Sequence, residues 1–310
     1  DYTFTSSNWD SAQTVTLTGI NDDVIDVDTQ TTVTVTVVDA SSNDEYDNVA
    51  DQTITVTTTD NDTAGFTKSE ATQTVTEGAG TDTFTLVLNA EPNSDVVLRV
   101  TSADTGEVTV GAADYTFTSG NWDSAQTVTL TGVNDDVDDG DINTTVTVTV
   151  VDASSDNNFD ALADQTITVT TTDNDTAGFT KSQTTRTVTE AGTTATFTLV
   201  LNAEPDSNVV LNVVSADTGE VTVGAADYTF TAANWDTPQT VTLTGINDTI
   251  VDTDTTTNVT ISVTDASSDN NFDALADQTV TVTTTDNETA GFTKSETART
   301  VTEAGGTATF

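Results

Sequence analysis

The sequence repeats with a period of 113 residues, and no insertion or deletion interrupts the repeat. Asp1-Tyr2-Thr3-Phe4 returns as Asp114-Tyr115-Thr116-Phe117 and again as Asp227-Tyr228-Thr229-Phe230. A solenoid unit spans roughly 20–50 residues, whereas a period of this length matches the commonest size of an independent domain. The chain is therefore predicted to be a tandem array of near-identical modules, each able to bury its own core.

Module boundaries are predicted where a closing acidic string is followed by Thr-Ala-Gly-Phe. This places a partial module over 1–62, complete modules over 63–175 and 176–288, and the start of a further module over 289–310. There is almost no linker between successive modules. Because the sequence begins and stops inside modules and contains no Met, we expect it to be a stretch of a longer array.

The charge balance is strongly acidic, with 51 Asp and Glu residues against 6 Lys and Arg and a formal net charge of −45. Nucleic acid and anionic lipid require a positive surface, so neither is an expected partner. The absence of Cys and His excludes disulfides, zinc–thiolate sites and the commonest general base. No apolar run approaches the roughly 20 residues of a membrane span.

Thr alternates with apolar residues along most of the chain, as in Thr32–Val37 and Thr127–Thr131. Period-two alternation of β-branched residues is typical of strands with one buried face, and no stretch shows a helical period. About seven strands are predicted for each module, separated by turn-forming clusters. In the module 176–288 they are expected near 178–189, 195–202, 208–214, 219–223, 227–242, 256–264 and 277–284, the fifth splitting near Trp235.

The acids gather at fixed positions between these strands. One cluster is Asn134–Asp141, with relatives at 21–28 and 247–254, and a second closes each module, as at Asp173-Asn174-Asp175. Single acids recur in the Asp-Tyr pair and in Val-Thr-Glu. Two carboxylates about 5 Å apart repel by roughly 3 kcal/mol at an effective dielectric of about 20, so such loops favour a bound cation. Calcium takes six to eight oxygen ligands at flexible geometry, and the sequence therefore predicts calcium sites.

In order and spacing, these motifs resemble the Calx-β module, which is named for sodium–calcium exchangers and recurs in large extracellular bacterial proteins. The resemblance rests on Val-Thr-Glu, then 224–228, then 241–248, then the closing acids, and it covers essentially each whole module. It implies tandem seven-stranded antiparallel immunoglobulin-like sandwiches, arranged as an elongated rod, with calcium bound by loops at one tip. The closing string is interrupted by Asn, which leaves the number of ions per module open.

The residues that match the family's ligands recur in every module. In 176–288 they are Glu190, Asp227, Asp248, Asp252, Asp254, Asp286 and Glu288. In 63–175 they are Glu77, Asp114, Asp135, Asp139, Asp141, Asp173 and Asp175. The partial modules retain Asp1, Asp22, Asp26, Asp28, Asp60 and Asp62 at one end and Glu303 at the other.

The repetition favours a calcium-binding structural or adhesive protein of the cell exterior, a stalk or surface filament stiffened by calcium at the module tips. Its expected partners are calcium ions and neighbouring modules, with lateral or end-to-end self-association left open. A calcium-sensing module and an acidic halophile-type surface without specific sites are the alternatives. An enzyme such as a glycosidase is not expected, because every acid pair recurs among like charges without a basic partner.

Overall fold

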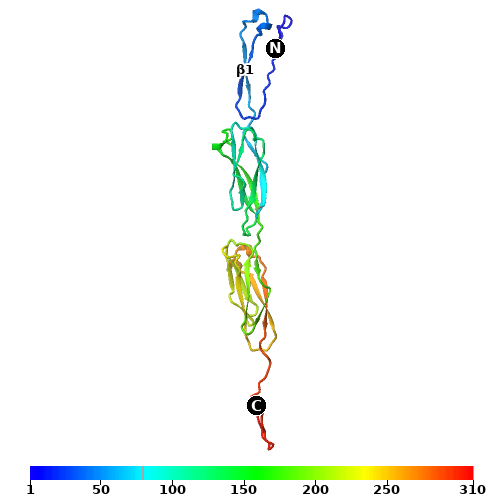
Figure 1. The fold of residues 1–310 in the computed structure, drawn as a ribbon, viewed down its shortest axis with the longest axis vertical. Helices are drawn as coiled ribbons and strands as arrows, with labels where there is room; N and C mark the ends of the chain where they lie inside the picture. Colours follow the sequence, from blue (N-terminus) through cyan, green and yellow to red (C-terminus); the bar gives the residue numbers. More distant parts are fainter. Residues whose placement is uncertain (79, 310) are drawn as a thin grey trace. The chain divides into compact units, whose positions relative to one another are not determined.

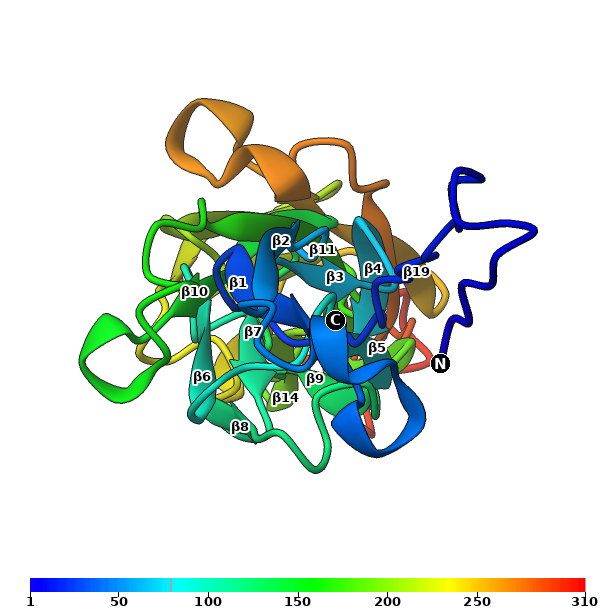
Figure 2. The ribbon, with the colours of Figure 1, turned by 90° about the horizontal axis from the view of Figure 1, so that it is seen from above.

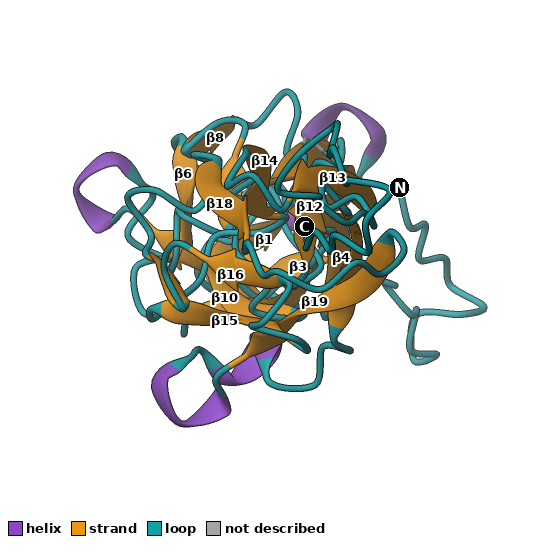
Figure 3. Cartoon of the chain, turned by 90° about the horizontal axis from the view of Figure 1, so that it is seen from below, coloured by secondary structure: helices purple, strands orange, loops and turns teal. Residues whose placement is uncertain are grey.

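The computed structural model describes residues 1–78 and 80–309, and this part of the chain is built from strands with a few short 3-10 turns. Thr-rich alternation produces the strands as predicted. In β10 (Ile142–Val150), for example, Val146 and Val148 are fully buried while Thr145 faces solvent. The short helices, purple in Figure 3, lie in loops outside the strands and are η1 (Asp39–Ser41), η2 (Asp44–Tyr46), η3 (Asp152–Ser154), η4 (Asp265–Ser267) and η5 (Asn270–Phe272).

The chain divides into two compact units. The first contains Asp1–Asn134 and Asp141–Thr172, and the second contains Asp135–Gly140 and Asp173–Phe310. The segment 135–140, which belongs to the predicted module 63–175, thus makes its contacts mainly with the second unit. The predicted module boundaries remain predictions.

The first unit holds a sandwich of two sheets, whose strands are labelled in Figure 2. One sheet has the order β4 (Thr72–Thr76), β11 (Gln165–Thr172), β10, β6 (Val96–Ser102), β8 (Asp114–Phe117). The other has the order β3 (Phe66–Lys68), β5 (Thr81–Leu88), β9 (Gln126–Gly132), β7 (Val108–Val110). Towards the N-terminus, β1 (Thr29–Val35) and β2 (Gln52–Thr58) form the antiparallel hairpin drawn in blue in Figure 1.

The second unit repeats the same sandwich. Its larger sheet has the order β13 (Thr185–Thr189), β20 (Gln278–Thr285), β19 (Thr255–Val263), β15 (Val209–Ser215), β17 (Asp227–Phe230). Its smaller sheet has the order β12 (Phe179–Lys181), β14 (Thr194–Leu201), β18 (Gln239–Gly245), β16 (Val221–Val223). Phe197, Phe230 and Leu243 lie between the sheets and are at most 1% exposed, so the alternating apolar residues form one continuous core.

The all-β sandwich fold is confirmed, but the predicted count of seven strands is too low for the described residues. The segment expected as one strand at 178–189 is divided between the two sheets. The segment 227–242 splits near Trp235 as expected, and its two strands also lie in different sheets, so each of the two described sandwiches has nine strands. β12 pairs antiparallel with β14, whereas β13 pairs parallel with β20 in the opposite sheet. One continuous strand could not bond to both sheets, and Ser182-Gln183-Thr184 carries the chain across.

The parallel pairing of β13 with β20 determines where the acids meet. Thr189 and Thr285, the last residues of these strands, are partners, so both strands end at one edge of the sheet. The antiparallel strand β19 begins at that edge, where Thr255 pairs with Thr284. The segments that follow β13 and β20 and the loop that precedes β19 therefore lie together.

Candidate metal centre

Glu190 is the residue that lies deepest among these acids. It follows β13 directly, and its N–H donates to the carbonyl of Thr285, 3.2 Å away, which holds it beside the end of β20. The residue is only 2% exposed, and its buried Oε2 has no hydrogen-bond partner. Burying a carboxylate oxygen without a hydrogen-bond donor destabilises the folded state, and a bound cation would remove this cost.

Glu190 belongs to two groups of carboxylates. In one, ligand oxygens of Glu190, Asp248 and Glu288 all lie within 4.8 Å of one another. In the other, ligand oxygens of Glu190, Asp252 and Asp286 lie within 4.8 Å of one another. Two sets of oxygens that share one buried glutamate can coordinate one ion or two neighbouring ions.

Local turns hold the partners of Glu190 in place. Asp248 Oδ1 accepts a hydrogen bond from the N–H of Ile250 at 2.6 Å, and Asp286 Oδ1 accepts one from the N–H of Glu288 at 2.8 Å. Such turns, in which a side-chain oxygen accepts from the backbone two residues later, are a standard use of Asp. Each uses one carboxylate oxygen and leaves the other available as a ligand.

The crowding of acids shifts their protonation. A side-chain hydrogen bond with Glu190, followed by burial and a hydrogen bond with Asp286, raises the pKa of Glu288 to about 7. Burial and the charges of Glu190, Asp286 and Asp248 raise the pKa of Asp252 above its ordinary value. Without a cation, the crowded carboxyl groups therefore bind protons more tightly than isolated carboxyl groups do.

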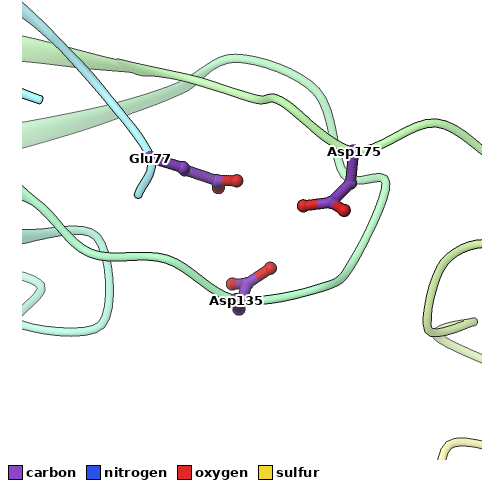
Figure 4. A group of neighbouring side chains, drawn as sticks. All are labelled: Glu77, Asp135 and Asp175. Atoms are coloured by element: carbon purple, nitrogen blue, oxygen red, sulfur yellow. The ribbon is translucent and has the colours of Figure 1, made fainter. Parts of the chain in front are cut away.

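The acids one period earlier repeat this arrangement. Ligand oxygens of Glu77, Asp135 and Asp175 lie within 4.8 Å of one another, and Figure 4 shows the three carboxyl groups pointing toward a common centre. Glu77 is 7% exposed, and the buried Oδ2 of Asp175 has no hydrogen-bond partner. Burial, together with neighbouring charges that include Asp136 and Asp173, raises the pKa of Asp175.

Other predicted ligands lie near these groups in supporting positions. Asp173 accepts hydrogen bonds from the N–H of Asp175 and of Gly140, at 2.7 and 2.8 Å. Burial and the charges of Asp135, Asp173 and Asp206 raise the pKa of Asp139. Asp254 accepts from the N–H of Asp286 at 3.3 Å, and Asp141 is exposed.

The partial module 1–62 gathers its acids in the same region of its loops. Asp22, Asp26, Asp60 and Asp62 line one hollow, and Asp28 accepts a hydrogen bond from the N–H of Asp60 at 3.1 Å. Burial raises the pKa of Asp62, and the charge of Asp60 adds to this. At the other end of the sequence, Glu303 is exposed in a turn.

Asp227, the acid of the Asp-Tyr pair, lies away from both carboxylate groups that contain Glu190. Asp227 accepts a hydrogen bond from Asn212 Nδ2 at 2.7 Å, and Asn212 pairs in turn with Ser262. Ser262 lies seven positions along β19 from Thr255, which is roughly 23 Å at about 3.3 Å per residue.

The equivalent acid in the preceding module has a basic partner. Asp114 forms a bidentate ion pair with Arg99, whose Nε lies 2.7 Å from Oδ1, and this hydrogen bond lowers the pKa of Asp114. The third equivalent, Asp1, is exposed. These three residues recur in the sequence as regularly as the clustered acids, but the structure places them away from the clusters.

Glu220 was missed by sequence reasoning although it lies near the Glu190 groups. Its carbonyl accepts a hydrogen bond from the N–H of Ile246 at 2.9 Å, and its buried Oε2 has no partner. Burial raises its pKa, and Asp252 is the first of the charges that add to this. The available signal was the recurrence of Ala-Asp-Thr-Gly-Glu-Val at 103–108 and 216–221.

The chemistry of the ligand set fits a hard cation. The unpartnered oxygens of Glu190, Glu220 and Glu288 are acceptors in their ionised form, and carboxylate oxygens are the preferred ligands of calcium and magnesium. An anion would meet only repulsion here, whereas a divalent cation would neutralise the group and use the oxygens that the fold leaves without donors.

No known family profile matches the sequence, and no curated protein does either. Solved structures to which the chain is similar include the calcium-binding domain CBD12 of CALX1.1, with 14% identity, 64% of this chain and 79% of that chain covered, and a TM-score of 0.30. Domains 4 and 5 of the S-layer protein SbsC align at 17% identity over 72% of this chain and 99% of that one, with a TM-score of 0.31.

Titin domains z1z2, solved in complex with telethonin, align at 13% identity over 73% of this chain and 98% of that one, with a TM-score of 0.35. Because the sequence identities and TM-scores of these three alignments are low, they assign no functional residue to the chain. Among the described residues, no helix is both long enough and apolar enough to cross a membrane.

Proposed function

We propose that the chain is a calcium-binding, repetitive structural or adhesive protein of the cell exterior, in which calcium bound at the module tips stiffens the array. The observation that carries this proposal is the buried Glu190, whose Oε2 has no partner and whose carboxyl group belongs to two acid clusters. A merely solvated acidic surface would leave its carboxylates in water, and it gives no reason to bury one of them.

Calcium is favoured over magnesium by the number of protein oxygens. Glu190, its four partners in the two groups and the neighbouring Glu220 offer more carboxylates than magnesium uses, since magnesium keeps several of its waters. The ligands also come from separate loops, which suits the flexible coordination geometry of calcium.

The repetition supports a structural role over a sensing role. The same acid positions recur in each 113-residue module, and a sensor needs few copies and a coupled effector. The proposal includes a location outside the cell, where about 0.1–1 mM calcium would fill sites of the affinity that is typical of extracellular modules. The proposed role is binding and mechanical, without a catalytic step.

Calorimetric titration of the chain with calcium and with magnesium tests the proposal. We expect calcium to bind at sub-millimolar to millimolar concentrations and magnesium to bind more weakly. Melting should then occur at higher temperature in calcium, since one site stabilises the folded state by about 2.7 kcal/mol at a hundredfold excess over Kd. If molar sodium restored stability as well as calcium did, the charges would only be screened and the proposal would fail.

Stiffening is tested separately by small-angle scattering in calcium. Replacing Asp173→Asn together with Asp175→Asn removes closing acids while leaving the cores intact. We expect the maximum dimension of the variant to shrink relative to the parent, because the Gly-containing connection at 176–179 becomes free to bend. An unchanged maximum dimension, with loss of the ion demonstrated by titration, would remove calcium's mechanical role.

A further inference from the structure

Asp156 and Asp269 are buried acids that belong to none of the carboxylate groups described above, and each is only 6% exposed. Asp269 Oδ2 accepts a hydrogen bond from the N–H of Ser207 at 2.8 Å, and its Oδ1 accepts one from the N–H of Asn271 at 3.0 Å. Asp156 makes the same two bonds one period earlier. Each buried acid therefore ties a corner of its module to a turn. We call these two segments the platform, and they comprise 89–94 with 156–159 in one copy and 202–207 with 269–272 in the next.

The corner of the platform pairs with the acidic loop 135–140, which precedes it by one module. Val137 forms a parallel bridge with Glu204. The N–H of Glu204 donates to the carbonyl of Asp136 at 2.7 Å. Loop and platform both belong to the second unit, so this pairing lies within one compact body.

The turn of the platform adds a side-chain contact to the same loop. Asn271 Nδ2 donates to the carbonyl of Asp138. The side chain of Asp138 is fixed as well, since its Oδ2 accepts from the N–H of Ala177 at 2.6 Å. Because Asp269 holds the backbone of Asn271, the donor stands in a defined place before the loop meets it.

The same contacts occur one period earlier, within the first unit. Val24 forms a parallel bridge with Glu91, and the N–H of Ile25 donates to the carbonyl of Glu91 at 3.3 Å. Asn93 and Asn158 both donate from Nδ2 to the carbonyl of Ile25, at 2.6 and 3.5 Å. In both copies the Asn of the turn follows the residue that it holds by 133 positions, which is more than one period.

The loop held in this way carries proposed cation ligands. Asp135 Oδ1 accepts a hydrogen bond from the N–H of Val137 at 2.9 Å, so the residue that forms the bridge also orients a ligand. Gly140, at the other end of the loop, donates its N–H to Asp173 Oδ2 at 2.8 Å. Asp139 lies between these two fixed points.

We propose that the platform of each module positions the cation ligands of the module before it, so that the calcium affinity of a site depends on the module that follows. This inference rests on the proposed calcium binding and assigns Asn271 as a positioning residue for the site of Asp135. An ordered loop loses less conformational entropy when an ion binds, which favours binding. By reciprocity, an ion that orders the loop strengthens its hold on the platform.

The position of Asn271 separates this inference from a local effect on its own module. The turn 269–272 precedes β20, whereas Glu288 follows it. The strand runs from Gln278 to Thr285, which is roughly 23 Å at about 3.3 Å per residue. A change at Asn271 should therefore act on the loop 134–141 of the preceding module and leave the loop 247–254 of its own module unaltered.

Hydrogen exchange with mass spectrometry on the chain 1–310 tests the inference, because peptides from the two loops differ in sequence and report separately. In chelator, Asn271→Ala and the isosteric Asn271→Asp should exchange several times faster than the parent over 134–141. In a calcium titration, the concentration that gives half of the full protection there should rise about 3–10-fold, as for one lost hydrogen bond. Asn271→Gln keeps the amide donor and should restore most of the protection.

The matched control is Asn93→Ala with Asn158→Ala, which should alter exchange over 21–28 and leave 134–141 as in the parent. Melting in chelator verifies that every variant is folded. An unchanged calcium midpoint over 134–141 in Asn271→Ala, or an equal shift over 247–254, would overturn the inference. If the parent still bound calcium by calorimetry, the proposed function would stand without it. If the parent bound no calcium, both would fail.

Discussion

Carboxylate oxygens of Glu190, at the end of β13, and Glu288, just beyond the end of β20, lie within 4.8 Å of each other. Two carboxyl groups this close repel each other when both are ionised, so one of them tends to keep its proton, and the pKa of Glu288 rises to about 7. That proton stands in for the positive charge that the proposed calcium ion would supply. Protons and calcium should therefore compete for this position, and several consequences can be measured.

The stability of the calcium-free chain should depend on pH in a defined direction. The pKa of Glu288 is about 7 in the folded state, against roughly 4.3 for an unperturbed Glu. Between these values the folded state binds more protons than the unfolded state, so the free energy of unfolding falls as pH rises from about 4 to about 7. Urea unfolding at several pH values in chelator measures this free energy. A free energy of unfolding that does not change between pH 4 and pH 7 would contradict the raised pKa of Glu288.

Calcium should abolish the fall in the free energy of unfolding with rising pH, because the ion replaces the proton. Calcium affinity should rise as pH increases through about 7, and binding below that pH should release protons. Calorimetry in buffers of different ionisation enthalpy counts the released protons. A binding enthalpy independent of the buffer would show that calcium binds elsewhere.

Glu190→Gln should weaken calcium binding in the module 176–288. Altered outer-shell partners of a metal typically cost 10–100-fold in affinity, and loss of a direct ligand should cost at least roughly as much. The calcium-free variant should melt higher than the parent, since a buried like charge is removed. The matched control is Asp227→Asn, which should leave the titration unchanged because Asp227 pairs with Asn212, away from the clusters.

Glu220→Gln tests whether an acid that only the structure brings near the Glu190 groups belongs to the proposed ligand set, which the sequence predicted without it. Because the charges of Asp252, Asp217 and Glu190 act on the buried Glu220 carboxyl group, its loss should weaken calcium binding, though less than loss of Glu190. Titration of both variants gives the comparison. An affinity for Glu220→Gln equal to that of the parent would remove Glu220 from the site.

Gly245→Ala should damage the site through the fold. A Cβ at Gly245 would lie 2.3 Å from the carbonyl oxygen of Thr189, the residue before Glu190, so the backbone must move. We expect a destabilisation of about 1–3 kcal/mol, typical of overpacking, together with weaker calcium binding. Gly291→Ala is the control, since its nearest neighbour lies 3.9 Å away and it is exposed. Equal melting of the two variants would contradict this account.

Much of the architecture was predictable from the sequence because its signals are local. Alternation of Thr with Val or Ile over a few residues is enough to predict strands, and a fixed period is enough to predict repeated modules. The acidic loops were found in the same way, since Asp135 and Asp248 recur at the same offset from Asn. Local alternation could not show that 178–189 divides between two sheets, because that depends on pairing with β14 and β20.

Which acids meet was decided only by the tertiary structure. In a regular repeat, Asp227 recurs as faithfully as Asp248, so recurrence cannot separate an acid in a hydrogen-bonded strand pair from one in a cluster. The parallel pairing of β13 with β20 brings Glu190 to Glu288, and the close approach at Gly245 places the loop with Asp248 beside them. The sequence alone determined the chemistry available in each loop, whereas strand pairing between distant segments decided which carboxylates share a centre.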